Sequence, residues 1–221
     1  MPVLKTARDQ FLAINSWTTT EVRRSSKVLR ELLATSPSVL TRIAAADALA
    51  RSAVPVRDLP TILAREKNDL VLDSLCQLAE ALNSAPCIPA LRLVASRGIS
   101  GLSRSAAFAA LWHIQGPKSF PFMIECRERE RSRRATAVMD VILLKAGVHQ
   151  ALERVIRSIA SKDYLVRCRV ANTLAVERPL LERKKLVVAL AAAEETEPTV
   201  AALEPLQAAL RALKASPRRS R

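Results

Sequence analysis

The chain has 221 residues, of which 49% are hydrophobic but only 3% aromatic, and it contains four glycines. Its apolar mass is mainly Ala, Leu, Val and Ile, which suits closely packed helices and argues against a sheet protein or a glycine-rich nucleotide cradle. With 35 lysines and arginines against 21 aspartates and glutamates, the formal net charge is +14, which favours an anionic partner such as nucleic acid, anionic lipid or an acidic protein.

The first predicted element is a capping helix within residues 1–17. This segment carries Lys5, Arg8 and Asp9 and lacks the apolar core of a secretion signal. No apolar run in the chain approaches the roughly 20 residues that a membrane span requires. The four cysteines are widely spaced and form no CxxC pair, which is typical of reduced thiols. We therefore expect a cytoplasmic protein with no membrane partner.

Residues 18–215 repeat one helical pattern at intervals of about 31 to 33 residues. One position of the second helix can be followed through five units, and we name its residues the ladder: Arg42, Asp73, Arg104, Arg134 and Arg167. The pattern predicts helical hairpins at 20–51, 57–83, 88–114, 118–146, 149–176 and 180–215. Because one hairpin cannot bury its own apolar stripe, neighbouring hairpins are expected to stack and share a core. The basic tail 216–221 is expected to be disordered.

The second helices carry an Arg followed by alanines and a leucine at helical spacing. The best matches are Arg42, Ala45, Ala48 and Leu49; Arg104, Ala107, Ala110 and Leu111; and Val166, Arg167, Ala171 and Leu174. At these positions the chain resembles the HEAT-like helical repeat family, in its short bacterial form, the PBS-lyase HEAT-like type. Asp73 and Val200 depart from the pattern at the Arg position.

This resemblance covers about residues 20–215 and implies an all-α fold, a right-handed α-α superhelix (solenoid) of about six HEAT-like hairpins. The second helices of such a fold line a concave face that often holds a partner. Most proteins of this kind resemble scaffolds, adaptors and regulatory subunits, and the fold by itself implies little about chemistry.

Two interpretations of the ladder remain open. Its charged side chains can form a strip offered to a partner, or they can bind loop carbonyls and acids between adjacent hairpins. The second interpretation is favoured. By analogy with family acid and base pairs, Glu128 is expected to pair with Arg134, and Asp163 with Arg169.

Two basic clusters are the candidate binding residues. The denser one is the turn of the fourth hairpin, Arg127 to Arg134, and its candidates are Arg127, Arg129, Arg131, Arg133 and Arg134. Guanidinium groups suit paired contacts with phosphate or carboxylate, although a solvated turn of alternating charge explains the same residues. The second cluster is Arg23, Lys27 and Arg30, which helical spacing places on one side of the first hairpin.

No motif supports catalysis. The only histidines are His113 and His149, and neither precedes a glutamate as in iron-binding HEAT-like hydroxylases. A helical-repeat DNA glycosylase needs an aromatic cleft with a carboxylate, and Trp112 beside His113 is the only suggestive pair. A nucleophile elbow such as GxSxG is absent as well. We expect no catalytic residues, no metal and no cofactor.

The sequence therefore predicts a non-catalytic binding scaffold or adaptor for a protein partner, an acidic surface being the kind that the charge favours. The alternative is a nucleic-acid-binding solenoid that uses the basic clusters and the tail, and a repair enzyme of the glycosylase type is a distant third. Against the nucleic-acid alternative, Asp73 and Glu80 interrupt any basic groove along the second helices.

Overall fold

The computed structural model describes residues 6–215, and every regular element in this range is helical. The predicted all-α class is therefore confirmed for these residues. The predicted tail 216–221 lies outside the described residues, as do the first five residues of the capping segment 1–17. The helices are α1 (Ala7–Ser16), α2 (Thr19–Arg24), α3 (Ser26–Thr35), α4 (Val39–Arg51), α5 (Leu59–Arg65), α6 (Asp69–Ala81), α7 (Ile88–Arg97), α8 (Gly101–Gln115), α9 (Phe120–Arg129), α10 (Arg133–Lys145), α11 (Ala151–Ile159), α12 (Tyr164–Glu177), α13 (Arg183–Glu195) and α14 (Val200–Lys214), with the short 3-10 helices η1 (Ala85–Cys87) and η2 (Gly116–Ser119).

Each predicted hairpin from 57–83 onward corresponds to two successive long helices, beginning with α5 and α6 and ending with α13 and α14. The first hairpin, 20–51, differs because α2 and α3 replace the single first helix that was expected. They meet at Ser25, whose φ of −95° and ψ of 12° depart from helical values. The start of α2 is set by a capping box, in which Glu21 Oε2 accepts from the Thr18 backbone N–H at 2.7 Å.

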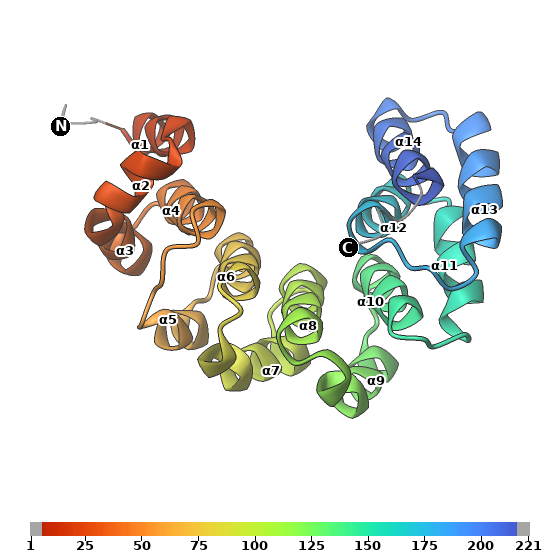
Figure 1. The fold of residues 1–221 in the computed structure, drawn as a ribbon, viewed down its shortest axis with the longest axis horizontal. Helices are drawn as coiled ribbons and strands as arrows, with labels where there is room; N and C mark the ends of the chain where they lie inside the picture. Colours follow the sequence, from red (N-terminus) through yellow and green to blue (C-terminus); the bar gives the residue numbers. More distant parts are fainter. Residues whose placement is uncertain (1–5, 216–221) are drawn as a thin grey trace, which may run out of the picture. The chain divides into compact units, whose positions relative to one another are not determined.

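Contacts divide the chain into two units, Met1–Cys126 and Arg127–Arg221, and the boundary falls within α9. In the first unit α4, α6 and α8 lie side by side, α1 packs against α4, and α5 packs against α7 (Figure 1). In the second unit α10, α12 and α14 lie side by side, and α11 packs against α13 (Figure 1). Within each unit, helices of the same type in successive hairpins therefore contact one another, which is consistent with a helical array.

Alanine explains how the second helices approach so closely. On α4 the side chains of Ala44, Ala45, Ala46 and Ala48 have no exposed surface. A residue of this size lets neighbouring backbones come together, while larger side chains such as the fully buried Phe108 fill the remaining space. The core therefore runs between successive second helices, and it continues between the two helices of a hairpin, as between α7 and α8.

The second helices α4 to α12 are each followed by a residue with positive φ, in chain order Ala53, Asn83, Gly116, Gly147 and Arg178. Gly116 differs from Arg178 in its ψ, which is −137° against 58°. After Ala53, the next backbone N–H, that of Val54, donates to the Leu49 carbonyl at 3.0 Å, and the chain repeats this bond after Asn83 and Gly147. This left-handed cap satisfies carbonyl groups that the end of a helix leaves without partners.

Gly98 lies in the turn between α7 and α8, where no side chain fits. A Cβ atom added there would be 2.5 Å from the Val94 carbonyl oxygen and 3.0 Å from Ser103 Oγ. The Gly98 carbonyl also accepts a hydrogen bond of 2.8 Å from Arg104 Nη1. The turn therefore leaves no space for a side chain at Gly98.

We expect Gly98→Ala to lower the free energy of unfolding by about 1–3 kcal/mol, because the backbone must shift to admit the new methyl group. Urea denaturation followed by circular dichroism measures this change. The matched control is Ile99→Ala at the neighbouring residue, whose side chain is 64% exposed. Equal stabilities of the two variants would contradict the close approach.

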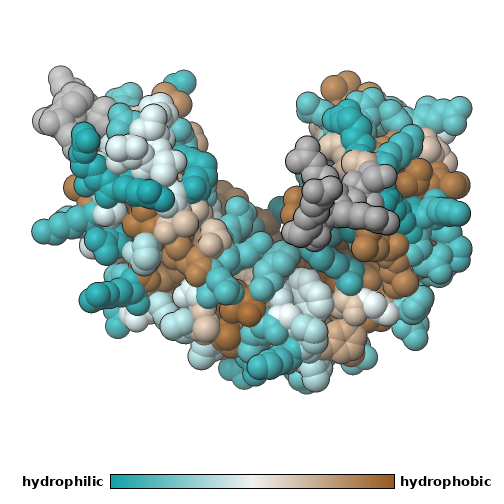
Figure 2. All heavy atoms as spheres, viewed as in Figure 1, coloured by the Kyte–Doolittle hydropathy of each residue, from teal (hydrophilic) through white to brown (hydrophobic). Residues whose placement is uncertain are grey.

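Some apolar side chains reach the surface. On the face drawn in Figure 2, apolar residues emerge in groups among polar ones in each unit. In the second unit the most exposed large apolar side chains are Val176, Leu180, Val188 and Val200. Of the helices described, none combines the length and the apolar character that crossing a membrane requires.

Candidate binding sites

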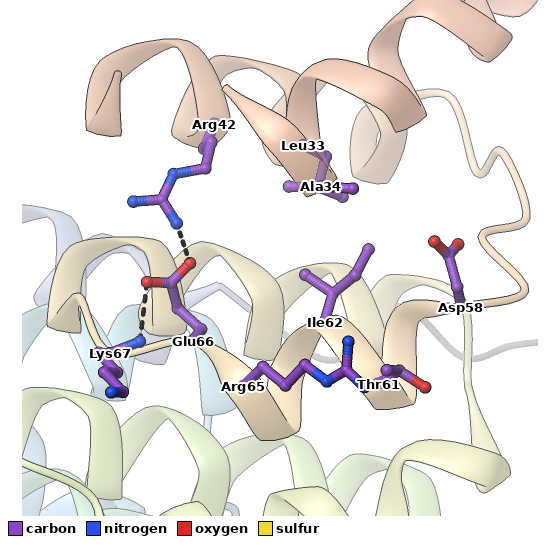
Figure 3. Close-up of a pocket in the computed structure, with 9 residues that line it drawn as sticks. All are labelled: Leu33, Ala34, Arg42, Asp58, Thr61, Ile62, Arg65, Glu66 and Lys67. Carbon is purple, nitrogen blue, oxygen red and sulfur yellow. Dashed lines mark hydrogen bonds and ion pairs between the residues drawn. The ribbon is translucent and has the colours of Figure 1, made fainter. Parts of the chain in front are cut away.

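Three recesses lie where the inter-helix turn of one hairpin faces the next hairpin. The first, of about 440 Å³, belongs to the first unit and lies between α3 and α5. Figure 3 shows Leu33 and Ala34 on one side of it and Ile62 on the other, with the paired side chains of Arg42 and Glu66 closing one end. The other two recesses belong to the second unit and are described below.

Ladder arginines bind acids of the following hairpin. The Arg42 guanidinium pairs with Glu66, and its Nε has no partner among the described residues. Arg167 makes the fuller version of this contact, because its Nε and Nη2 donate to the two carboxylate oxygens of Glu197 at 2.5 and 2.6 Å. Arg134 lies 3.5 Å from Asp163 in a more exposed pair. These contacts are of the kind that the favoured interpretation of the ladder describes.

The acids in the turns also hold the backbone of their own hairpin. Glu66 Oε1 accepts from the backbone N–H groups of Lys67 and Asn68 at 2.8 and 2.7 Å. Glu197 Oε1 accepts in the same way from Thr199 at 2.9 Å. Hydrogen bonds from Arg167 lower the pKa of the Glu197 carboxyl, and the Thr199 backbone adds to this effect. One carboxylate therefore fixes a turn and joins it to the preceding hairpin.

Sequence reasoning missed these turn acids, although they carry a signal. Glu66, Glu130 and Glu197 each stand three residues before the first residue of a second helix. Glu130 makes the same local contacts as Glu66, since its Oε1 accepts from the backbone of Arg131 and Ser132 at 2.9 and 2.8 Å. The expected pairings of Glu128 with Arg134 and of Asp163 with Arg169 are wrong. Arg134 instead pairs with Asp163, which belongs to the next hairpin.

The other two ladder residues make local contacts as well. Arg104 Nη1 donates to the Gly98 carbonyl, and Arg167 Nη1 donates to the Ser161 carbonyl at 2.6 Å, in each case six residues earlier. Asp73 accepts a hydrogen bond of 3.0 Å from Gln77 Nε2, one helical turn later on α6.

The basic loop Arg127 to Arg134 separates into a structural residue and exposed ones. Arg127 donates through Nε and Nη2 to both carboxylate oxygens of Asp140 at 2.8 Å. Asp140 also accepts from Arg154 Nε at 2.7 Å, and its side chain is only 2% exposed. The remaining predicted arginines lie at the surface, namely Arg129, Arg131, Arg133 and Arg134.

The second recess, which we name the arginine recess, is built around this network. It has a volume of about 430 Å³ and is lined by Arg127, Arg133, Arg154 and Arg157 together with Asp140. Four arginines against one aspartate leave a local charge of +3. The hydroxyl groups of Thr136, Ser158 and Ser161 complete its polar lining. Sequence reasoning found the α9–α10 side of this recess and missed α11, which supplies Arg154 and Arg157.

The third recess, which we name the alanine groove, has a volume of about 820 Å³ and is larger than the two recesses described above. It lies where α13 faces the α11–α12 turn. Its lining includes Ala189, Ala192 and Ala193 of α13 and Ile156 and Ile159 of α11, and the pair Arg167–Glu197 also lines it. Small side chains at positions i, i+3 and i+4 share one helix face, so they leave an apolar hollow.

The second predicted cluster does not lie on one helix. Arg23 belongs to α2, whereas Lys27 and Arg30 belong to α3, and the break at Ser25 separates them. Arg23 and Lys27 are exposed, and Arg30 is half-buried with its Nε donating to the Ser26 carbonyl at 3.2 Å. None of the three recesses described above includes these residues.

The histidine and cysteine side chains that could take part in catalysis or metal binding make structural contacts. His113 Nδ1 lies 2.8 Å from Glu80 Oε1, which joins α8 to α6. None of the four cysteines forms a disulfide, and burial raises the pKa of the Cys76 thiol well above its ordinary value. Within residues 6–215, no group of three or more His, Cys, Asp and Glu side chains is placed to hold a metal ion.

Comparison with protein-family models, with curated proteins and with solved structures finds no match for this chain. The recesses and the side chains that line them are therefore the features that indicate a function.

Proposed function

We propose that the chain is a non-catalytic binding scaffold that engages an acidic segment of a protein partner. In this proposal the helical array is a right-handed superhelix of HEAT-like hairpins, and its inter-hairpin grooves receive the partner. The protein acts in the cytoplasm by holding or positioning that partner, without changing it chemically.

The arginine recess carries the proposal. Its four guanidinium groups come from three helices, α9, α10 and α11, and Asp140 holds two of them in place. A guanidinium whose orientation is fixed before binding loses less side-chain freedom when it meets a carboxylate or phosphate. The net charge of the recess is positive even with Asp140 included, so an anionic side chain is the ligand that suits it.

Two observations favour a protein over a nucleic acid. Asp73 and Glu80 lie on α6 among the second helices, so the basic charge does not form a continuous track there. Few aromatic side chains are available for base stacking. Among the large apolar side chains that are exposed within residues 6–215, one is aromatic, that of Tyr164, which is 41% exposed. Both features favour a protein partner over a nucleic acid.

The test compares variants of the tagged chain purified from the cells that naturally produce it. We expect a protein to co-purify in stoichiometric amount with the wild type. In the double variant Arg133→Ser, Arg157→Ser, the amount of this co-purified protein is expected to fall at least tenfold. The matched control is Arg169→Ser with Arg211→Ser, which removes the same charge from exposed positions outside the recess.

A second measurement addresses nucleic acid directly. The affinity of the wild type for a duplex DNA of about 20 base pairs is measured between 50 and 200 mM salt, a range over which several phosphate contacts cost roughly 10³-fold or more. Tight duplex binding with this steep salt dependence, in a chain that retains no stoichiometric protein, would overturn the scaffold proposal and favour the alternative.

A further inference from the structure

The arginine recess and the alanine groove are neighbours within the second unit. Ser161 lines both of them, and they lie on opposite sides of the α11–α12 turn. One recess is cationic and the other is mainly apolar. We propose that together they form one bipartite site for an extended segment of a partner protein, with an oxyanion side chain in the arginine recess and an apolar side chain in the alanine groove.

The cationic half is ready to bind an oxyanion. Asp140 occupies Nε and Nη2 of Arg127 and Nε of Arg154, and a guanidinium has five N–H donors. The remaining N–H groups of these two arginines add to the donors of Arg133 and Arg157. The four arginines together carry more positive charge than one buried carboxylate neutralises. A phosphoryl group and a carboxylate share the required chemistry, since both present several acceptor oxygens and negative charge.

The apolar half is large enough for a side chain of the partner. Alanines 189, 192 and 193 form one face of α13, and Ile156 and Ile159 of α11 stand against it. Tyr164 lies at the edge with 41% of its surface exposed. Apolar surface left open in this way marks a place where an apolar group is removed from water on binding.

The distance between the halves sets the spacing in the ligand. The two recesses are successive grooves of one helical array, so their separation is about one interhelical distance, roughly 8–10 Å. An extended chain advances about 3.3 Å per residue. The oxyanion and the apolar side chain are therefore about three residues apart in the bound segment.

This inference rests on the proposed function, because it names the segment that the scaffold binds. A nucleic acid fits the pair of recesses poorly, since its backbone has no apolar group for the alanine groove. A single amino acid or an inorganic anion fits it poorly too, because neither can reach both halves.

Fluorescence anisotropy with synthetic peptides and the full chain tests the site. The probes are ten-residue peptides that contain phosphoserine and leucine three residues apart, in both orders, and versions with glutamate in place of phosphoserine. Further probes replace the leucine by glycine or the anionic residue by serine. Tighter binding of the phosphoserine or of the glutamate probes identifies which oxyanion the recess receives, and either result supports the site.

We expect loss of the leucine to weaken binding about tenfold, as burial of one large apolar side chain predicts. Ala192→Trp, which fills the alanine groove, is expected to weaken the leucine peptide by a similar factor. The control is Ala191→Trp, an exposed residue of the same helix outside the groove lining, which is expected to bind like the wild type. Circular dichroism establishes that both variants fold.

Two negative results are distinguishable. If no anionic peptide binds the wild type, both the bipartite site and the proposed function are overturned. If the peptides bind, and binding depends on Arg133 and Arg157 but is indifferent to the leucine and to Ala192→Trp, only the bipartite site is overturned.

Discussion

Replacing Asp140 by alanine is expected to lower the free energy of unfolding by about 2–4 kcal/mol. The carboxylate is 2% exposed and accepts three hydrogen bonds from Arg127 and Arg154. Its removal leaves two guanidinium groups close together without their shared counter-charge. Removal of one partner of a fully buried ion pair costs roughly 3–5 kcal/mol, and partial exposure of the two arginines moves the expectation toward lower values.

Urea denaturation at pH 7 measures this change, and the matched control is Glu153→Ala. Glu153 is an exposed carboxylate on α11, next to Arg154, so its loss changes the net charge equally without emptying a buried site. Asp140→Asn separates shape from charge, because it retains the side-chain volume. A cost below 1 kcal/mol for Asp140→Ala would show that the two arginines do not depend on this carboxylate.

The pair Arg167–Glu197 is expected to make stability depend on pH. Glu197 is 1% exposed in its side chain and Arg167 is 11% exposed, so Glu197→Gln leaves a largely buried guanidinium without its anion. We expect a loss of about 2–4 kcal/mol at pH 7. Arg167 lowers the pKa of Glu197 in the folded chain below its ordinary value of 4.5.

A lowered folded pKa means that the unfolded chain takes up the proton first as the pH falls. The stabilisation from Glu197 is therefore fully present above pH 4.5, and it disappears as the pH falls through the lower pKa of the folded state. The wild type is expected to keep its advantage over Glu197→Gln from neutral pH down to 4.5 and to lose it as the pH falls further, through the pKa of the folded state. Glu195→Gln, an exposed neighbour, serves as the control. A constant difference across this pH range would contradict the assignment.

The helices could be predicted because their signals are local and repeated. The recurrence of arginine, alanine and leucine placed each second helix, and the observed helices lie close to the predicted hairpins. The break between α2 and α3 was not predicted, because residues around Ser25 have ordinary helix propensity and the capping box at Thr18 indicates only where α2 starts.

The candidate site was predicted in part. Arg133 was found because it belongs to a dense basic run, whereas Arg154 and Arg157 stand alone in a helix of mixed charge. Arg127 was predicted as a binding residue of that run, yet it binds a carboxylate 13 residues later. A net charge counted along the chain cannot show such pairings, which depend on how α11 packs beside α10.

The alanine groove was not predicted, because a hollow is a property of two facing helices. Ala189, Ala192 and Ala193 look like core residues in the sequence, as the alanines of α4 are in the structure. On α13 the same residue type faces an open recess. Only the position of α11 relative to α13 distinguishes the two cases.

The left-handed caps after the second helices have a consequence for how the array tolerates sequence change. Alanine, asparagine and arginine adopt at residues 53, 83 and 178 a positive φ, as glycine does at residues 116 and 147. For a residue other than glycine this conformation costs about 1–2 kcal/mol. The hydrogen bond that accompanies it after Ala53 and Asn83 runs back to a carbonyl of the same second helix. Each second helix therefore carries its own chain reversal, so a hairpin duplicated within the array would bring the bend with it.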